Sequence, residues 1–79
     1  MDYSKVLQRV TEIFATMADT EEEITADSEL IEDLGISSMD VLFLISSLEE
    51  EFKIKVPEKA IRKMFTIADV AEIITDLVA

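Results

Sequence analysis

Residues 33–52 read DLGISSMDVLFLISSLEEEF, and this stretch decides the predicted fold. It holds the only glycine of the chain, Gly35, which suits a turn or a close backbone approach. Either Ser37 or Ser38 can cap a helix that we predict over residues 39–52. Apolar side chains recur there every three or four residues, at Met39, Leu42, Ile45, Leu48 and Phe52, with Leu44 beside them. Val41 and Phe43 fall outside this stripe.

The preceding residues predict one helix and a long loop. A helix over residues 3–17 follows from apolar spacings of three and four, and Asp2 is a suitable N-cap. Its stripe contains Tyr3, Val6, Leu7, Val10, Ile13, Phe14 and Met17. Residues 18–36 lose this period, although Thr20–Glu23 resembles a capping box and predicts a short turn. The side chains expected to anchor this loop are Ile24, Leu30, Ile31, Leu34 and Ile36.

The residues after the quoted stretch predict a connector and two further helices. Residues 53–56 alternate in polarity but are too few for a sheet, and Pro57 suits the first position of a short helix over 58–64. Thr66 and Asp69 resemble a cap, which opens a last helix with Ile67, Val70, Ile74 and Leu77 on its stripe. We therefore predict an all-α fold, a single domain over residues 1–79 with three main helices, one short helix and a long loop between the first two.

Composition excludes several classes of function. The chain has no Cys and no His, which removes Cys/His zinc sites and the usual catalytic nucleophile–base pairs. We therefore predict that it is not an enzyme and binds no catalytic metal. A calcium loop starting at Asp27 is also excluded, because its fifth and sixth positions are Ile31 and Glu32. No signal peptide or bilayer-spanning stretch is present, which predicts a soluble cytoplasmic protein.

The negative charge is unevenly distributed. The net charge is −11, with eight acids and no base in residues 19–34, and five of the seven bases in residues 53–65. Such a surface repels nucleic acid and anionic membranes. It suits partners with basic docking patches, although acids also simply keep a small protein soluble. The five bases of residues 53–65 also have two interpretations. They either compensate the acids within the protein, or they contact acidic partners or a phosphate.

The two serines mark the candidate site. A hydroxyl at a helix start, after a turn at Gly35, would place an attached phosphate at free backbone N–H groups and at the positive end of the helix dipole. An ordinary N-cap explains the same serine, and caps are far commoner than modification sites.

Residues 33–40 resemble the attachment motif of the acyl carrier proteins, which reads Asp-x-Gly-x-Asp-Ser-Leu-Asp. The similarity continues through residues 48–52, 56–57 and 66–67. It implies a four-helix bundle with 4′-phosphopantetheine, taken from coenzyme A, covalently attached to Ser38. Ser37 replaces the usual Asp of the motif and is assigned as the cap. Acyl intermediates would be held as thioesters on this arm, for fatty acid, polyketide or specialised lipid synthesis.

The resemblance also implies partner and cargo residues. Those implied for partner binding are Asp33, Met39, Asp40, Val41, Phe43 and Glu49. Those implied for an acyl pocket are Leu42, Ile45, Ile54, Ala60, Ile61 and Met64. Helix stability explains Asp40 equally well, and core packing explains the pocket residues. Phe43 stands where many family members have a docking Glu, and Ser46 where many have an apolar contact. Phe43 is therefore either a core residue or an exposed apolar contact.

The implied partners are a phosphopantetheinyl transferase and acyl-transferring, condensing or ligase enzymes with basic docking patches. The carrier is expected to be a monomer that neither binds nucleic acid nor inserts into membranes. Two alternatives stay open, a peptidyl or aminoacyl carrier protein with the same arm and an unmodified helical protein-binding adaptor, which would not need Ser38.

Self-repulsion predicts that ions stabilise this protein. With a net charge of −11, the folded chain holds acids closer together than the unfolded chain does. Added sodium chloride or divalent cations should therefore raise the melting temperature, followed by circular dichroism. A melting temperature that stays constant across salt would show that repulsion does not limit the fold.

Overall fold

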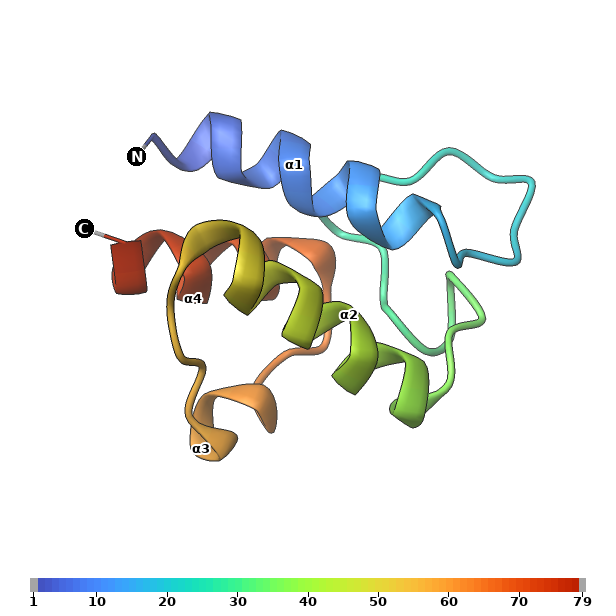
Figure 1. The fold of residues 1–79 in the computed structure, drawn as a ribbon. Coiled ribbons are helices and arrows are strands. Elements are labelled where there is room, and N and C mark those ends of the chain that lie inside the picture. The colour runs from blue at the N-terminus through green and yellow to red at the C-terminus, as the bar shows by residue number, and fades with distance from the viewer. Residues whose placement is uncertain (1, 79) are drawn as a thin grey trace.

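Four helices make up the computed structural model, which describes residues 2–78 (Figure 1). They are α1 (Tyr3–Ala15), α2 (Ser38–Phe52), α3 (Glu58–Ile61) and α4 (Ile67–Val78). Within residues 2–78 the only β-type pairing is an isolated bridge between Glu29 and Thr66. The predicted all-α fold, with three longer helices, one short helix and a long first loop, is confirmed. No helix in this range is long and apolar enough to cross a membrane.

Helix boundaries differ from the predictions by one to three residues. α1 ends at Ala15 rather than at residue 17, because the Thr16 backbone N–H and hydroxyl both donate to the Ile13 carbonyl. α2 begins one residue early, at Ser38. α3 stops at Ile61 rather than at residue 64.

The core is built mainly between α1 and α4, which lie side by side in Figure 1. Along α1 the buried residues are Val6, Val10 and Phe14, which follow one another at four-residue intervals. From α4 the buried residues are Ile67, Val70, Ala71 and Ile74. Tyr3 and Met17, predicted on the buried stripe of α1, are 36% and 37% exposed. They lie at or beyond the helix ends, where the stripe leaves the core.

The side of α2 that packs in the core agrees only in part with the prediction, which is confirmed for Ile45, Leu48 and the neighbouring Leu44. Its buried residues are Val41, Leu44, Ile45 and Leu48. Val41, predicted outside the stripe, is only 8% exposed, whereas Met39 and Leu42, predicted on it, are 76% and 48% exposed. The helix is apolar on several sides, so its period alone does not select the side that packs against α1 and α4.

Three fully buried aliphatic side chains and the half-buried Ile24 anchor the loop between α1 and α2. Leu30, Leu34 and Ile36 are at most 2% exposed, as predicted, while Ile31 is 57% exposed and does not anchor. The backbone adds a second attachment, because Leu30 N donates to the Phe65 carbonyl at 2.9 Å and Ile67 N donates to the Ser28 carbonyl at 3.1 Å. The loop is thereby fixed to the α3–α4 connection.

Helix caps follow the sequence closely. Asp2 accepts a hydrogen bond from Ser4 N, as predicted. Thr66 Oγ1 accepts from Asp69 N at 3.1 Å and Asp69 Oδ2 accepts from Thr66 N at 3.0 Å, so the predicted cap of α4 is reciprocal. Pro57 takes the N-cap position of α3 rather than its first helical position. Thr20 accepts from Glu22 N within a bend and caps no helix.

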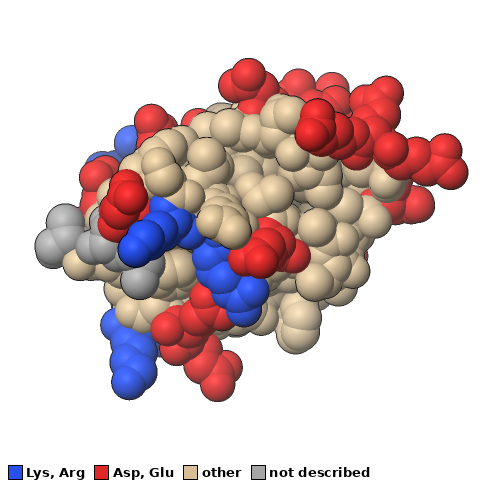
Figure 2. All heavy atoms as spheres, turned by 90° about the horizontal axis from the view of Figure 1, so that it is seen from above, with Lys and Arg blue, Asp and Glu red and all other residues tan. Residues whose placement is uncertain are grey.

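One ion pair joins α1 to α2. The Arg9 guanidinium donates from Nε and Nη2 to the two Glu51 carboxylate oxygens, both at 2.6 Å. These hydrogen bonds lower the pKa of the Glu51 carboxyl below its ordinary value of 4.5. Figure 2 shows the wider charge pattern on one face, with acids spread across it and the basic side chains in its left half.

Truncation of Phe14 should destabilise the fold strongly, because its side chain is fully buried between helices. We expect Phe14→Ala to lower the free energy of unfolding by about 3 kcal/mol or more, measured by urea titration. The matched variant is Phe43→Ala, because Phe43 is 62% exposed and its loss should cost less than about 0.5 kcal/mol. Equal losses in the two variants would contradict the assigned burial.

The ion pair should contribute to stability only above the pKa of Glu51. Because folding lowers this pKa, the contribution is present above about pH 4.5 and is lost as the pH falls through the folded-state value. Wild type should therefore lose its advantage over Glu51→Gln on acidification, as measured by urea titrations from neutral to acidic pH. The difference should be small because both side chains reach solvent. If the difference in free energy of unfolding between wild type and Glu51→Gln stayed constant with pH, the ion pair between Arg9 and Glu51 would be contradicted.

Candidate functional site

The start of α2 is fixed by the turn that precedes it. Gly35 has a φ of +68°, a conformation that other residues rarely adopt, so the turn predicted there is confirmed. A Cβ at Gly35 would meet Asp19 at 3.5 Å, and Asp19 N donates to the Leu34 carbonyl at 2.7 Å. Ile36, buried to 2% exposure, then fixes the backbone two residues before Ser38.

The two serines have different environments. Ser37 is the N-cap of α2, and its Oγ accepts a hydrogen bond from Asp40 N at 3.2 Å. Ser38 is the first helical residue and is exposed. Among residues 2–78, none makes a hydrogen bond to the Ser38 hydroxyl. Ser37 is therefore the cap of this helix. The Ser38 oxygen is free at the helix start, where the helix dipole favours an attached phosphate.

An open groove of about 530 Å³ lies beside Ser38. Its lining is mainly apolar and comes from the long loop, α2, α3 and the α3–α4 connection. The apolar lining residues are Leu30, Ile31, Val41, Leu42, Ile61, Met64 and Phe65, and the polar ones are Glu29, Glu32, Ser38 and Arg62. The structure thus places the candidate attachment point on the rim of a groove that an apolar chain could enter.

Half of the residues predicted for an acyl pocket line this groove. Leu42, Ile61 and Met64 do so. Ile45 instead packs in the core at 2% exposure, because it lies on the side of α2 that faces the bundle. Ala60 lines a separate groove between α3 and α4.

Ile54 also does not line the groove beside Ser38, because it packs against the core from the connector after α2. Ile45, Ile54 and Ala60 therefore lie outside this groove, and their role toward an acyl chain stays a prediction. The prediction did not include the groove residues of the loop and of the α3–α4 connection, such as Ile31 and Phe65. Their signal in the sequence was an apolar side chain within a polar, non-helical segment.

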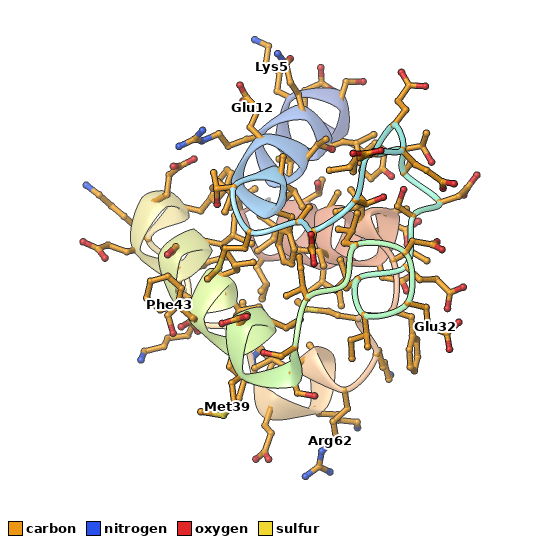
Figure 3. The ribbon with its side chains drawn as sticks, turned by 90° about the vertical axis from the view of Figure 1, so that its right-hand side faces the viewer. Lys5, Glu12, Glu32, Met39, Phe43 and Arg62 are labelled. Carbon is orange, nitrogen blue, oxygen red and sulfur yellow. The ribbon has the colours of Figure 1, made fainter. Side chains whose placement is uncertain are left out.

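The residues predicted for partner binding divide by exposure. Met39 and Phe43 lie one helical turn apart on the exposed side of α2, and Figure 3 shows both pointing outward. Phe43 is therefore not a core residue. Val41 is buried and offers little surface, because packing selects it for the core.

Two of the predicted acids have roles within the fold. Glu49 Oε2 accepts a hydrogen bond from Val56 N at 2.7 Å and so ties the end of α2 to the connector. Asp33 Oδ2 accepts from Glu29 N at 2.8 Å and closes the turn before Gly35. Asp40 is half-buried in the first turn of α2. Local hydrogen bonding is therefore sufficient to explain Asp33 and Glu49.

Three basic side chains lie on and after α3. Lys59, Arg62 and Lys63 are all exposed. Arg62, labelled in Figure 3, lines the groove beside Ser38 and donates to Glu58 Oε1 at 3.1 Å. Within residues 2–78 no group of three or more acidic side chains is arranged to hold a metal ion.

These features define a small helical carrier with an accessible serine at a helix start, and the comparison with known families agrees. A family model described as "Phosphopantetheine attachment site" matches residues 8–76. The chain belongs to this family, whose domain is the attachment site of 4′-phosphopantetheine in acyl carrier proteins.

Named relatives agree with this membership. The chain is 34% identical over 80 residues to an acyl carrier protein of Saccharopolyspora erythraea, covering 100% of this chain and 84% of that one. It is 38% identical over 72 residues to an acyl carrier protein of Clostridium perfringens, covering 90% and 95%. The fold matches the acyl carrier protein from Enterococcus faecalis with a TM-score of 0.80 at 26% identity, covering 98% and 99%. The resemblance seen in the sequence is therefore confirmed.

Proposed function

We propose that this protein carries acyl intermediates as thioesters on a 4′-phosphopantetheine arm attached to Ser38. The observation that supports this most is the exposed Ser38 hydroxyl, which starts α2 in the position of the motif serine while Ser37 Oγ serves as the cap. Acyl carrier proteins are carriers and not catalysts. On this proposal residues 1–79 form one carrier domain that performs no chemistry alone.

Loading of the arm requires a transferase and coenzyme A. The Ser38 oxygen would attack the phosphorus on the pantetheine side of the coenzyme A diphosphate, and the bond to the second phosphate would break. The products are the phosphodiester on Ser38 and 3′,5′-ADP, and a base of the transferase takes the serine proton. This chain contributes the exposed oxygen and the helix N-terminus, which favours the phosphate that remains.

The groove supports an apolar cargo. An arm on Ser38 begins on its rim, and the side chains of Leu42, Ile61 and Met64 lie within it. Met and branched aliphatic side chains can yield to a guest chain. We therefore place this carrier in fatty acid or related lipid or polyketide synthesis, ahead of peptidyl carriage. The apolar lining of the groove supports this preference for an acyl over a peptidyl cargo.

The charge supports enzyme partners with basic docking patches. With a net charge of −11, the chain should be steered toward such surfaces before contact. The partners proposed on this basis are the transferase and the acyl-transferring, condensing or ligase enzymes that use the loaded arm. Nucleic acid is not among them, because it would be repelled.

Mass spectrometry tests the attachment directly. Incubated with coenzyme A and a phosphopantetheinyl transferase, the wild-type chain should gain the mass of one prosthetic group. Ser38→Ala should gain none, because its oxygen is missing. Ser37→Ala should still be loaded, although it loses a helix cap that is worth about 1 kcal/mol. Circular dichroism of both variants checks that they fold.

Two results would contradict the proposal. Loading of Ser38→Ala would place the arm elsewhere, and no loading of wild type by several transferases would favour the unmodified adaptor. Once the chain is loaded, offering acyl and aminoacyl donors would separate the two kinds of carrier.

A further inference from the structure

The exposed side of α2 is apolar in its N-terminal half, although the protein is strongly charged. Met39 is 76% exposed, Phe43 is 62% exposed and Leu42 is 48% exposed. Their spacing of three and four residues places them on one side of the helix. Residues 41–48 contain no charged residue, although 32% of the chain is charged. We call Met39, Leu42 and Phe43 the α2 stripe.

Two of the four acids of α2 are already engaged within the protein. The helix contains four of them, Asp40 and Glu49 to Glu51. Glu49 bonds Val56 N, and Glu51 is held by two hydrogen bonds from Arg9. Asp40 is half-buried at the helix start, which leaves Glu50 as the exposed acid without such a bond among residues 2–78. Because Arg9 offsets the charge of Glu51, a partner that recognised α2 by charge would find less uncompensated charge than its four acids suggest.

The position of the stripe indicates what covers it. Met39 follows Ser38 directly, and Leu42 lines the same groove as Ser38. Phe43 lies five residues after Ser38, which is about 7.5 Å along the helix axis. An enzyme acting at the distant end of an arm can sit away from α2. An enzyme that catalyses bond formation at the Ser38 oxygen must bring its bound coenzyme A and its catalytic base against that oxygen. Even a small interface covers about 600–800 Å² of each partner, so it would include the stripe.

We infer that the transferase which loads Ser38 holds Met39 and Phe43 in an apolar pocket, and that this contact supplies more of the docking affinity than the acids of α2 do. The inference rests on the proposed attachment at Ser38. Exposed aromatic side chains that become fully buried are the usual anchors of an interface. The negative charge then speeds the encounter, and the α2 stripe holds the complex.

Steady-state loading kinetics provide the test, using coenzyme A and a phosphopantetheinyl transferase that loads the wild-type chain. Phe43→Ser should lower kcat/KM about tenfold, mainly through a higher KM, because burial of its exposed area is lost. Met39→Ser should act in the same direction, and Phe43→Leu should retain most of the wild-type value. Glu50→Gln should change kcat/KM by less than about twofold.

Salt separates apolar from ionic docking. Between about 0.1 and about 1 M sodium chloride the Debye length falls from about 10 to about 3 Å. The ratio of wild-type to Phe43→Ser kcat/KM should persist across this range, whereas any effect of Glu50→Gln should vanish. Leu77→Ser is the matched control, because Leu77 is 38% exposed but lines the groove between α3 and α4. Melting curves of all variants exclude unfolding as the cause.

The outcomes distinguish this contact from the attachment itself. If wild type loads while Phe43→Ser and Met39→Ser load at the wild-type kcat/KM, the apolar contact is overturned and the attachment stands. A larger loss in Glu50→Gln than in Phe43→Ser would also overturn the contact, in favour of recognition by charge. If wild type gains no mass with any transferase, the attachment at Ser38 fails first and the contact falls with it.

Discussion

The exposure of one hydroxyl depends on the burial of the loop before it. Leu30, Leu34 and Ile36 are held in the core, and the chain between them turns at Gly35 in a left-handed conformation. Hydrogen bonds from the loop to Phe65 and from Ile67 back to the loop fix the same segment to the α3–α4 connection. If this anchoring were lost, α2 would have no fixed start and the groove would lose one wall.

The acids of this protein act at two length scales. The net charge of −11 acts at a distance and changes the rate at which the protein encounters charged partners. At close range several acids accept hydrogen bonds from the backbone, as Asp33, Glu49 and Asp69 do. An acidic residue in a motif is therefore not by itself a docking residue. In this fold the local bonds are the firmer explanation for those three acids.

Sequence predicted the elements of the fold well because their signals are local. Caps at Asp2, Ser37 and Thr66 depend on residues within one turn, and the period of α1 identifies a single buried side. Of the seven apolar groove residues only Leu42, Ile61 and Met64 were predicted, because residues such as Ile31 and Phe65 lie in non-helical segments that have no periodic signal. The family motif predicted Ser38 as the attachment point, but no local signal distinguished its free oxygen from that of a capping serine.

The buried side of α2 was predicted only in part, and the cause of this error explains the properties of the site. A helix with one apolar side has one way to pack, whereas α2 is apolar on several sides and its period fits more than one orientation. Packing resolves this by burying Val41, Leu44, Ile45 and Leu48. The apolar residues that remain, Met39, Leu42 and Phe43, cannot enter the core and stay at the surface beside Ser38. The excess of apolar residues that made the orientation ambiguous thus leaves the surface next to Ser38 able to bind an apolar partner.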